Sequence, residues 1–119
     1  GERVTGPPQE LVGAAVNEVA LVGRLSLAPE ARVLPSGDEM VALRVLVPRS
    51  GTPRRKGAPT VDVIDIACWS AATRRAALRL EAGAPIEVKG ALRRRFFRGA
   101  SGVASRYEVE AASVRRHRG

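Results

Sequence analysis

The sequence is poor in cysteine and histidine, and both shortages limit the chemistry that the chain can perform. Cys68 is the single cysteine among 119 residues, so no internal disulfide and no cysteine-based zinc site can form, and we expect the chain in the reducing cytoplasm. His117 is the single histidine, and no glycine-rich phosphate loop or metal-ligand spacing is present. We therefore expect that the chain is not an enzyme, has no catalytic residue, and binds no cofactor or metal.

Long apolar runs and aromatic residues are also scarce. No run approaches the roughly 20 residues that cross a bilayer, and residues 1–8 lack the apolar centre of a signal peptide, so we expect no membrane contact. The length and a hydrophobic content of 45% are those of one globular domain. Because aromatic residues make up only 3% of the chain, its core must be built mainly from Val, Leu, Ile and Ala.

Acidic residues are outnumbered, and the excess of basic residues is uneven. Twenty Lys and Arg against twelve Asp and Glu give a net charge of +8. Residues 1–92 hold twelve basic and ten acidic residues (+2), and residues 93–119 hold eight and two (+6). Eighteen of the twenty are Arg, which contacts phosphate in bidentate fashion and stacks on bases, so nucleic acid is the first partner to consider. A bias in genomic base composition would also enrich Arg, and this alternative stays open.

Alternating apolar and polar residues predict five strands, at residues 16–25, 41–47, 61–69, 86–97 and 103–112. A short extended piece at 30–34 and a basic loop at 49–59 lie between them. Ser70 and Gly83 mark the two ends of a predicted helix over 71–82. We expect one domain over residues 16–113, preceded by a flexible segment, 1–15, and followed by a basic tail, 114–119.

This order of elements is typical of the OB-fold. The OB-fold is an all-β, five-stranded Greek-key barrel that binds single-stranded nucleic acids or oligosaccharides, and its single helix lies between the third and fourth strands, as it does here. A small open sandwich is the alternative.

Strand parity places six residues on the face that points away from the core: Arg24, Arg44, Trp69, Arg93, Arg95 and Phe97. Aromatic rings interleaved with Arg are typical of a sheet that binds single-stranded nucleic acid. The basic loop adds four more candidates: Arg49, Arg54, Arg55 and Lys56. Two alternatives stay open, because Trp69 could fill the groove under the helix and Phe97 could cover the barrel mouth.

The same parity places other side chains on the core side. Phe96 shares the parity of Leu92, and Tyr107 shares that of Val109, so both aromatic residues are predicted to lie in the core. Arg94 is predicted to point towards the core side or its rim, and we expect it to act in stability or assembly. Cys68 is predicted to be a small buried side chain.

Several motifs, in order along the chain, resemble the bacterial single-stranded DNA-binding protein family. They are Asn17–Leu25, Pro29–Gly37, Ile66–Trp69, Leu80–Gly83 and Ile86–Arg93. The resemblance covers residues 17–112. It implies an OB-fold, sequence-tolerant binding of single-stranded DNA at the nucleoid in the cytoplasm, and a homo-oligomer, a tetramer built from dimers or a dimer.

The resemblance also assigns roles to particular residues. Trp69 and Phe97 stand where the family places base-stacking aromatics. The family's further aromatics, in the loop at 50–59 and at the position of Val63, are missing, and Ile64 replaces a histidine near a subunit contact. Relatives commonly end in an acidic peptide that recruits repair and replication enzymes, whereas residues 115–119 are basic, so we expect a truncated sequence or a divergent paralogue.

We therefore expect a protein that binds single-stranded DNA and protects or organises exposed strands in replication, recombination or repair. The alternative is a protein-interaction module that resembles the primosomal relatives of the family and binds DNA weakly. The missing aromatics favour the module, whereas Trp69, Phe97 and the basic loop favour DNA binding.

Overall fold

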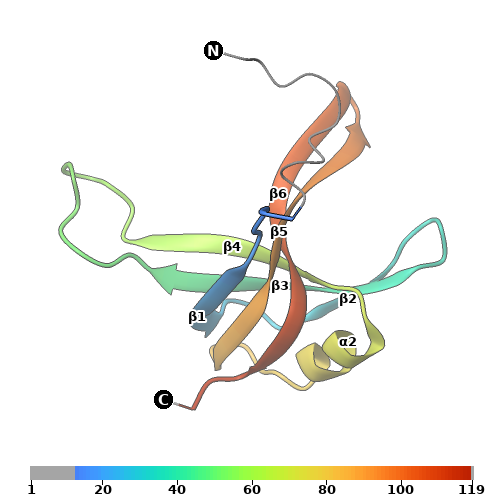
Figure 1. Ribbon diagram of the computed structural model, residues 1–119, viewed down its shortest axis with the longest axis horizontal. Coiled ribbons are helices and arrows are strands. Elements are labelled where there is room, and N and C mark those ends of the chain that lie inside the picture. The colour runs from blue at the N-terminus through green and yellow to red at the C-terminus, as the bar shows by residue number, and fades with distance from the viewer. Residues whose placement is uncertain (1–12, 119) are drawn as a thin grey trace.

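The computed structural model describes residues 13–118, which form six strands and one helix (Figure 1). The elements are β1 (Val19–Leu25), β2 (Glu30–Val33), β3 (Glu39–Pro48), β4 (Val61–Cys68), α2 (Ala71–Leu78), β5 (Pro85–Gly99) and β6 (Gly102–Arg116). The five predicted strands are confirmed, and the predicted extended piece is the short strand β2. The predicted flexible segment lies outside the described residues except for 13–15. No helix within residues 13–118 is long and apolar enough to span a membrane.

The strands form one sheet that closes on itself. Their order is β1-β5-β6-β4-β3-β2, and β1 also pairs with β3 at Arg24 and Leu25, so the five long strands complete a barrel. Neighbouring strands are antiparallel except β4 and β6, which run parallel through Ile66 and Ala67. Along the chain, the helix α2 follows β4 and precedes β5. The predicted OB-fold is confirmed.

The core fills the inside of this barrel with small aliphatic side chains. Because successive side chains on a strand point to opposite faces, every second residue of β3 and β4 is directed inwards. The core cluster consists of Leu25, Val41, Leu43, Val45, Ile66, Cys68, Ala77, Ile86, Val88, Val109, Ala111 and Val114. None of these side chains is aromatic, so the four aromatic residues of the chain are available for other positions.

Two glycines allow the barrel to close. A Cβ on Gly23 would lie 2.2 Å from the carbonyl oxygen of Leu46, where β1 turns to meet β3. A Cβ on Gly90 would lie 2.0 Å from the carbonyl oxygen of Glu110, where β5 passes closest to β6. Both distances are far below van der Waals contact, so any larger residue at either position would push the strands apart.

The predicted end of the helix is wrong. Ser70 caps its start as predicted, because the Ser70 Oγ accepts a hydrogen bond of 3.1 Å from the backbone N–H of Thr73. The helix ends at Leu78, however, and not at Ala82. Gly83 does adopt a positive φ of 84°, but in the turn that leads to β5, where its N–H donates to the carbonyl oxygen of Leu25.

The predicted basic tail is also wrong over residues 114–116. Strand β6 continues to Arg116, and Val114 is buried opposite Val88. The pairing changes from Lys89 with Ser113 to Gly90 with Ala111, so one extra residue, Ala112, bulges from β6. A bulge reverses which parity faces the core. Because of this reversal, residues 113–116 do not continue the alternation of residues 103–111, and the alternation therefore predicts that the strand ends too early.

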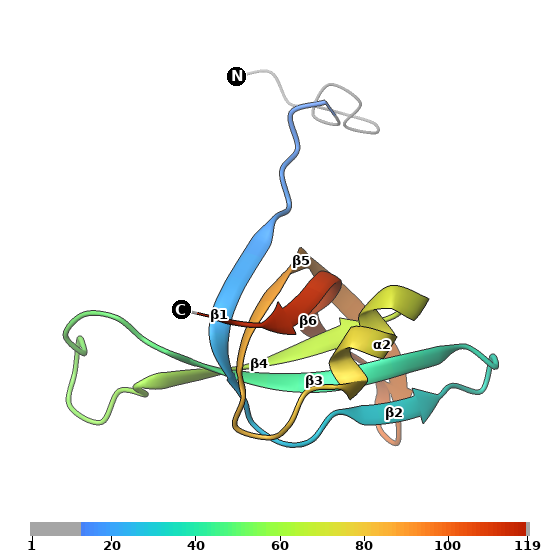
Figure 2. The ribbon, with the colours of Figure 1, turned by 90° about the horizontal axis from the view of Figure 1, so that it is seen from below.

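Three segments extend from the barrel and shape its surface. The far half of the β5–β6 hairpin projects from one side (Figure 1). The loop between β3 and β4 and the turn between β2 and β3 reach out on opposite sides of the barrel, as both views show (Figure 2). The hairpin and the β3–β4 loop carry most of the candidate binding residues.

Candidate nucleic-acid interface

One face of the β5–β6 hairpin combines two aromatic rings with two Arg side chains. Trp69 directly follows β4, and the guanidinium carbon of Arg95 lies 5.0 Å from the centre of its ring. Phe97 is 48% exposed, and the guanidinium carbon of Arg106 lies 5.8 Å from the centre of its ring. We call these four residues the Trp69 face. The structure thus brings together three of the predicted site residues, Trp69, Arg95 and Phe97.

A hollow joins the Trp69 face to strands β2 and β3. It is lined by Arg32, Leu34, Met40, Arg95, Phe97 and Arg106. Sequence reasoning missed Arg32 and Arg106. Arg106 could have been found, because a hairpin with a tight turn at Ala100 and Ser101 pairs it directly with Arg95. Arg32 bonds Glu30 at 2.6 Å and holds the pKa of that carboxyl below its usual range.

A buried carboxylate holds Arg95 in place. Glu108 is only 4% exposed, and its Oε2 lies 3.4 Å from Nη1 of Arg95. A second ion pair on the same side of the hairpin is similar, since Nη2 of Arg93 lies 3.6 Å from Oε1 of Glu110. These carboxylates orient the two Arg side chains and neutralise part of their charge. A phosphate that binds here must compete with them.

Two further predicted phosphate ligands are paired with acidic side chains. Arg44 on β3 contacts Asp65 directly opposite it on β4, at 3.2 Å. Arg49 donates two hydrogen bonds to Asp62, at 2.8 and 3.0 Å. Because all four side chains are well exposed, such pairs contribute only about 0 to 1 kcal/mol and exchange readily with other anions.

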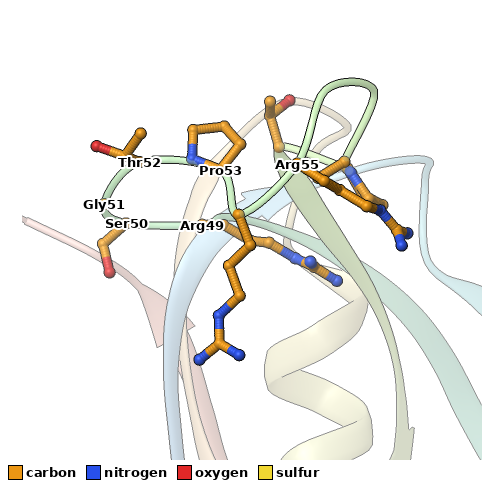
Figure 3. Close-up of a pocket in the computed structure, with 10 residues that line it drawn as sticks. Arg49, Ser50, Gly51, Thr52, Pro53 and Arg55 are labelled. Carbon is orange, nitrogen blue, oxygen red and sulfur yellow. The ribbon is translucent and has the colours of Figure 1, made fainter.

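The basic loop between β3 and β4 carries cations without such partners. Among residues 13–118, Arg54, Arg55 and Lys56 make no ion pair, and all three are exposed. The loop encloses a hollow lined by residues 49–55 and 58–60, part of which Figure 3 shows. Unpaired cations on an exposed loop provide an electrostatic attraction for phosphate.

Arg24 lies apart from these groups. Its Nη1 donates a hydrogen bond of 3.0 Å to the carbonyl oxygen of Gly83. Together with Val22, Leu46, Pro48 and Val61 it lines a separate, largely apolar hollow on β1, β3 and β4. The structure therefore does not place Arg24 with the Trp69 face.

The predicted burial of two aromatic residues is wrong. Phe96 is 65% exposed and Tyr107 is 60% exposed, although both were expected in the core. Their parity was assigned correctly, because both lie on the side of Leu92 and Val109. At Phe96 and Tyr107 the hairpin extends beyond the barrel, because β1 pairs with β5 only as far as Gly90. The side of the strands that faces the core elsewhere is therefore exposed to solvent here. Arg94 lies between the two rings and is exposed as well.

Cys68 is fully buried, as predicted. Burial raises the pKa of the thiol to about 11, against the opposing effect of a hydrogen bond with Thr73. Such a thiol stays protonated and is a poor nucleophile. Within residues 13–118, no three His, Cys, Asp or Glu side chains are grouped closely enough to hold a metal ion.

The closed barrel, the one helix within residues 13–118, and an outer face that pairs aromatic rings with Arg side chains define an OB-fold protein. The family model described as Single-strand binding protein family matches residues 16–117, and the chain belongs to this family. Among solved structures, a Plasmodium falciparum SSB in complex with ssDNA superposes with a TM-score of 0.64 at 18% identity, over 84% of this chain and 91% of that chain. No curated protein matches the sequence.

Proposed function

We propose that this chain binds single-stranded DNA through the Trp69 face and the basic loop. The observation that carries the proposal is the pairing of each ring with a guanidinium group, Arg95 over Trp69 and Arg106 over Phe97, in a member of the single-strand binding family. Bases stack on such rings with roughly 1 to 3 kcal/mol each, whatever the sequence. Arg side chains bind the phosphates between the stacked bases.

The wider role follows from this activity. We infer that the protein protects or organises exposed strands in replication, recombination or repair, in the cytoplasm at the nucleoid. A homo-oligomer, either a tetramer built from dimers or a dimer, would place several such faces along one strand. Replication or repair proteins are the further partners we propose. Membership of a family described by single-strand binding fits our expectation that the chain is not an enzyme.

One feature favours the alternative of a protein-interaction module. Val63 is exposed where the family resemblance implies an aromatic ring, and the basic loop contains none. Two missing stacks would weaken DNA binding by roughly 2 to 6 kcal/mol. Arg54, Arg55 and Lys56 can offset part of this loss electrostatically.

The single tryptophan makes the test direct, because Trp69 reports only on its own face. Its fluorescence is titrated with a mixed-sequence single strand and with the matching duplex, and the mass of each sample is measured by light scattering. We expect strong quenching by the single strand and at least about tenfold weaker binding of the duplex, whose bases are already stacked. Equal affinities would indicate a general basic surface. Absence of any binding would favour the interaction module.

A further inference from the structure

We propose that the opposite side of the β5–β6 hairpin is a second base-stacking site, so that one DNA strand passes around the hairpin and contacts both of its faces. We call this side the Tyr107 face; it consists of Arg94, Phe96, Arg98, Val103, Ser105 and Tyr107. The proposal rests on the proposed function, because it concerns the same ligand. It adds a site that the family resemblance does not assign.

The geometry of the Tyr107 face repeats that of the Trp69 face. The guanidinium carbon of Arg94 lies 5.0 Å from the ring centre of Phe96 and 5.7 Å from that of Tyr107. Ser105 holds this guanidinium group, since its Oγ accepts hydrogen bonds of 3.2 and 3.1 Å from Nε and Nη2 of Arg94. Each face therefore presents two aromatic rings together with Arg.

The rings of this face are open to a ligand. Phe96 and Tyr107 are 65% and 60% exposed, more than Phe97 on the Trp69 face, at 48%. Large exposed aromatic side chains are costly to leave in water, and adjacent ones mark interaction sites in soluble proteins. Only four residues of this chain are aromatic, and two of them lie here.

The positive charge of the Tyr107 face favours an anionic ligand. It carries Arg94 and Arg98 and no acidic residue, and neither Arg forms an ion pair within residues 13–118. On the Trp69 face, Glu108 neutralises part of the charge of Arg95, and Arg106 has no ion pair within residues 13–118. A polyanion with stackable bases complements both the charge and the rings of the Tyr107 face.

A single strand can reach both faces because the tip of the hairpin is short. Gly99 pairs with Gly102, so only Ala100 and Ser101 form the turn. Phe96 and Phe97 are neighbours that point to opposite faces, and each lies two or three residues from the pair that closes the turn. At about 3.3 Å per residue, the pair that closes the turn lies about 7 Å along the strand from Phe97 and about 10 Å from Phe96.

The test compares neighbouring residues with opposite orientations. Trp69 fluorescence is titrated with oligothymidylate of about 5 and of about 20 nucleotides, lengths that lie within and beyond the site of one OB-fold. We expect the double variant Phe96→Ala/Tyr107→Ala to bind the short strand as the unmodified protein does. It should bind the long strand at least about fivefold more weakly, with fewer nucleotides occluded per chain. The matched control, Phe97→Ala, should weaken binding of both lengths.

A second variant leaves the rings in place. Arg94→Gln should reduce the salt dependence of binding by about 0.7 in log–log slope for the long strand, with no change for the short one. Melting temperatures establish that each variant is folded, and light scattering gives its mass.

The outcomes separate this proposal from the proposed function. The second site is overturned if both Tyr107-face variants bind the long strand normally while Phe97→Ala binds it weakly, and the proposed function then stands. A fall in mass in either Tyr107-face variant, with normal strand binding, would overturn the second site by assigning this face to a contact between copies. Failure of the unmodified protein to bind either strand would refute the proposed function itself.

Discussion

Replacement of Arg95 by Met tests how the Trp69 face is held together. Met keeps an unbranched apolar side chain near Trp69 but removes the charge that balances Glu108, 3.4 Å away. Breaking a fully buried ion pair costs about 3 to 5 kcal/mol, because the remaining charge is left without a partner. The Arg95 side chain is 34% exposed, so water reaches this pair, and we expect a loss of about 1 to 3 kcal/mol in the free energy of unfolding.

The double variant Arg95→Met/Glu108→Gln separates stability from binding. Removing the orphaned carboxylate should restore most of the lost stability, whereas the contact between Arg95 and phosphate stays absent. Both variants should therefore bind single-stranded DNA about fivefold more weakly, with a salt slope shallower by about 0.7. Denaturant unfolding gives the stability, and Trp69 fluorescence gives the affinity.

Two results would refute this reasoning. If Arg95→Met were as stable as the unmodified protein, the pair with Glu108 would not be what orders Arg95. If the double variant regained full affinity together with its stability, Arg95 would act on DNA only through the fold and not through contact with phosphate. Glu108→Gln alone is the control, because it leaves the Arg95 side chain available to a phosphate.

Two further predictions concern the basic loop and the thiol. Replacing Arg54, Arg55 and Lys56 together by Gln should lower the salt slope of single-strand binding by about 2, that is about 0.7 for each lost phosphate contact, whereas Arg79→Gln on the far end of the helix should leave it unchanged. An unchanged slope in the loop variant would exclude the loop from the interface. Cys68, with its pKa raised to about 11, should react with a disulfide reagent at pH 8 only as fast as the barrel opens. As the pH rises, the Cys68 thiol ionises in the unfolded chain before it does so in the folded protein. The contribution of Cys68 to the free energy of unfolding should therefore fall as the pH rises from the ordinary thiol pKa towards 11, and Cys68→Ala should lack this pH dependence.

The fold could be predicted from the sequence because its strands alternate clearly. In β3, Val41, Leu43 and Val45 point into the barrel and Arg44 points out, as their parity predicts. Local signals also located the start of the helix, since Ser70 caps it. These features depend only on residues that are close together in the chain.

The partners of the predicted Arg side chains depend on register, which parity does not give. Arg44 and Asp65 are 21 residues apart, and they meet because β3 and β4 pair with Ala42 opposite Ala67. The bulge at Ala112 shifts the register of β6 in the same unpredictable way. Sequence analysis therefore identified Arg side chains on the outward face but treated as free several that are paired with carboxylates.

The error at Phe96 has a different cause, and its signal was present in the sequence. Parity says to which side of a strand a residue points, but it does not say whether another element covers that side. β1 pairs with β5 only as far as Gly90, and β4 reaches β6 only at Val109 and Glu110. Beyond these contacts the side of Phe96 and Tyr107 faces solvent, and Phe97 on the other side is also exposed. A strand with one buried face alternates in polarity, whereas residues 93–98, with the sequence Arg-Arg-Arg-Phe-Phe-Arg, carry Arg and Phe on both parities. Such a run indicates a strand whose two faces meet the same surroundings, and the same chemistry on both sides is what one ligand that wraps the hairpin requires.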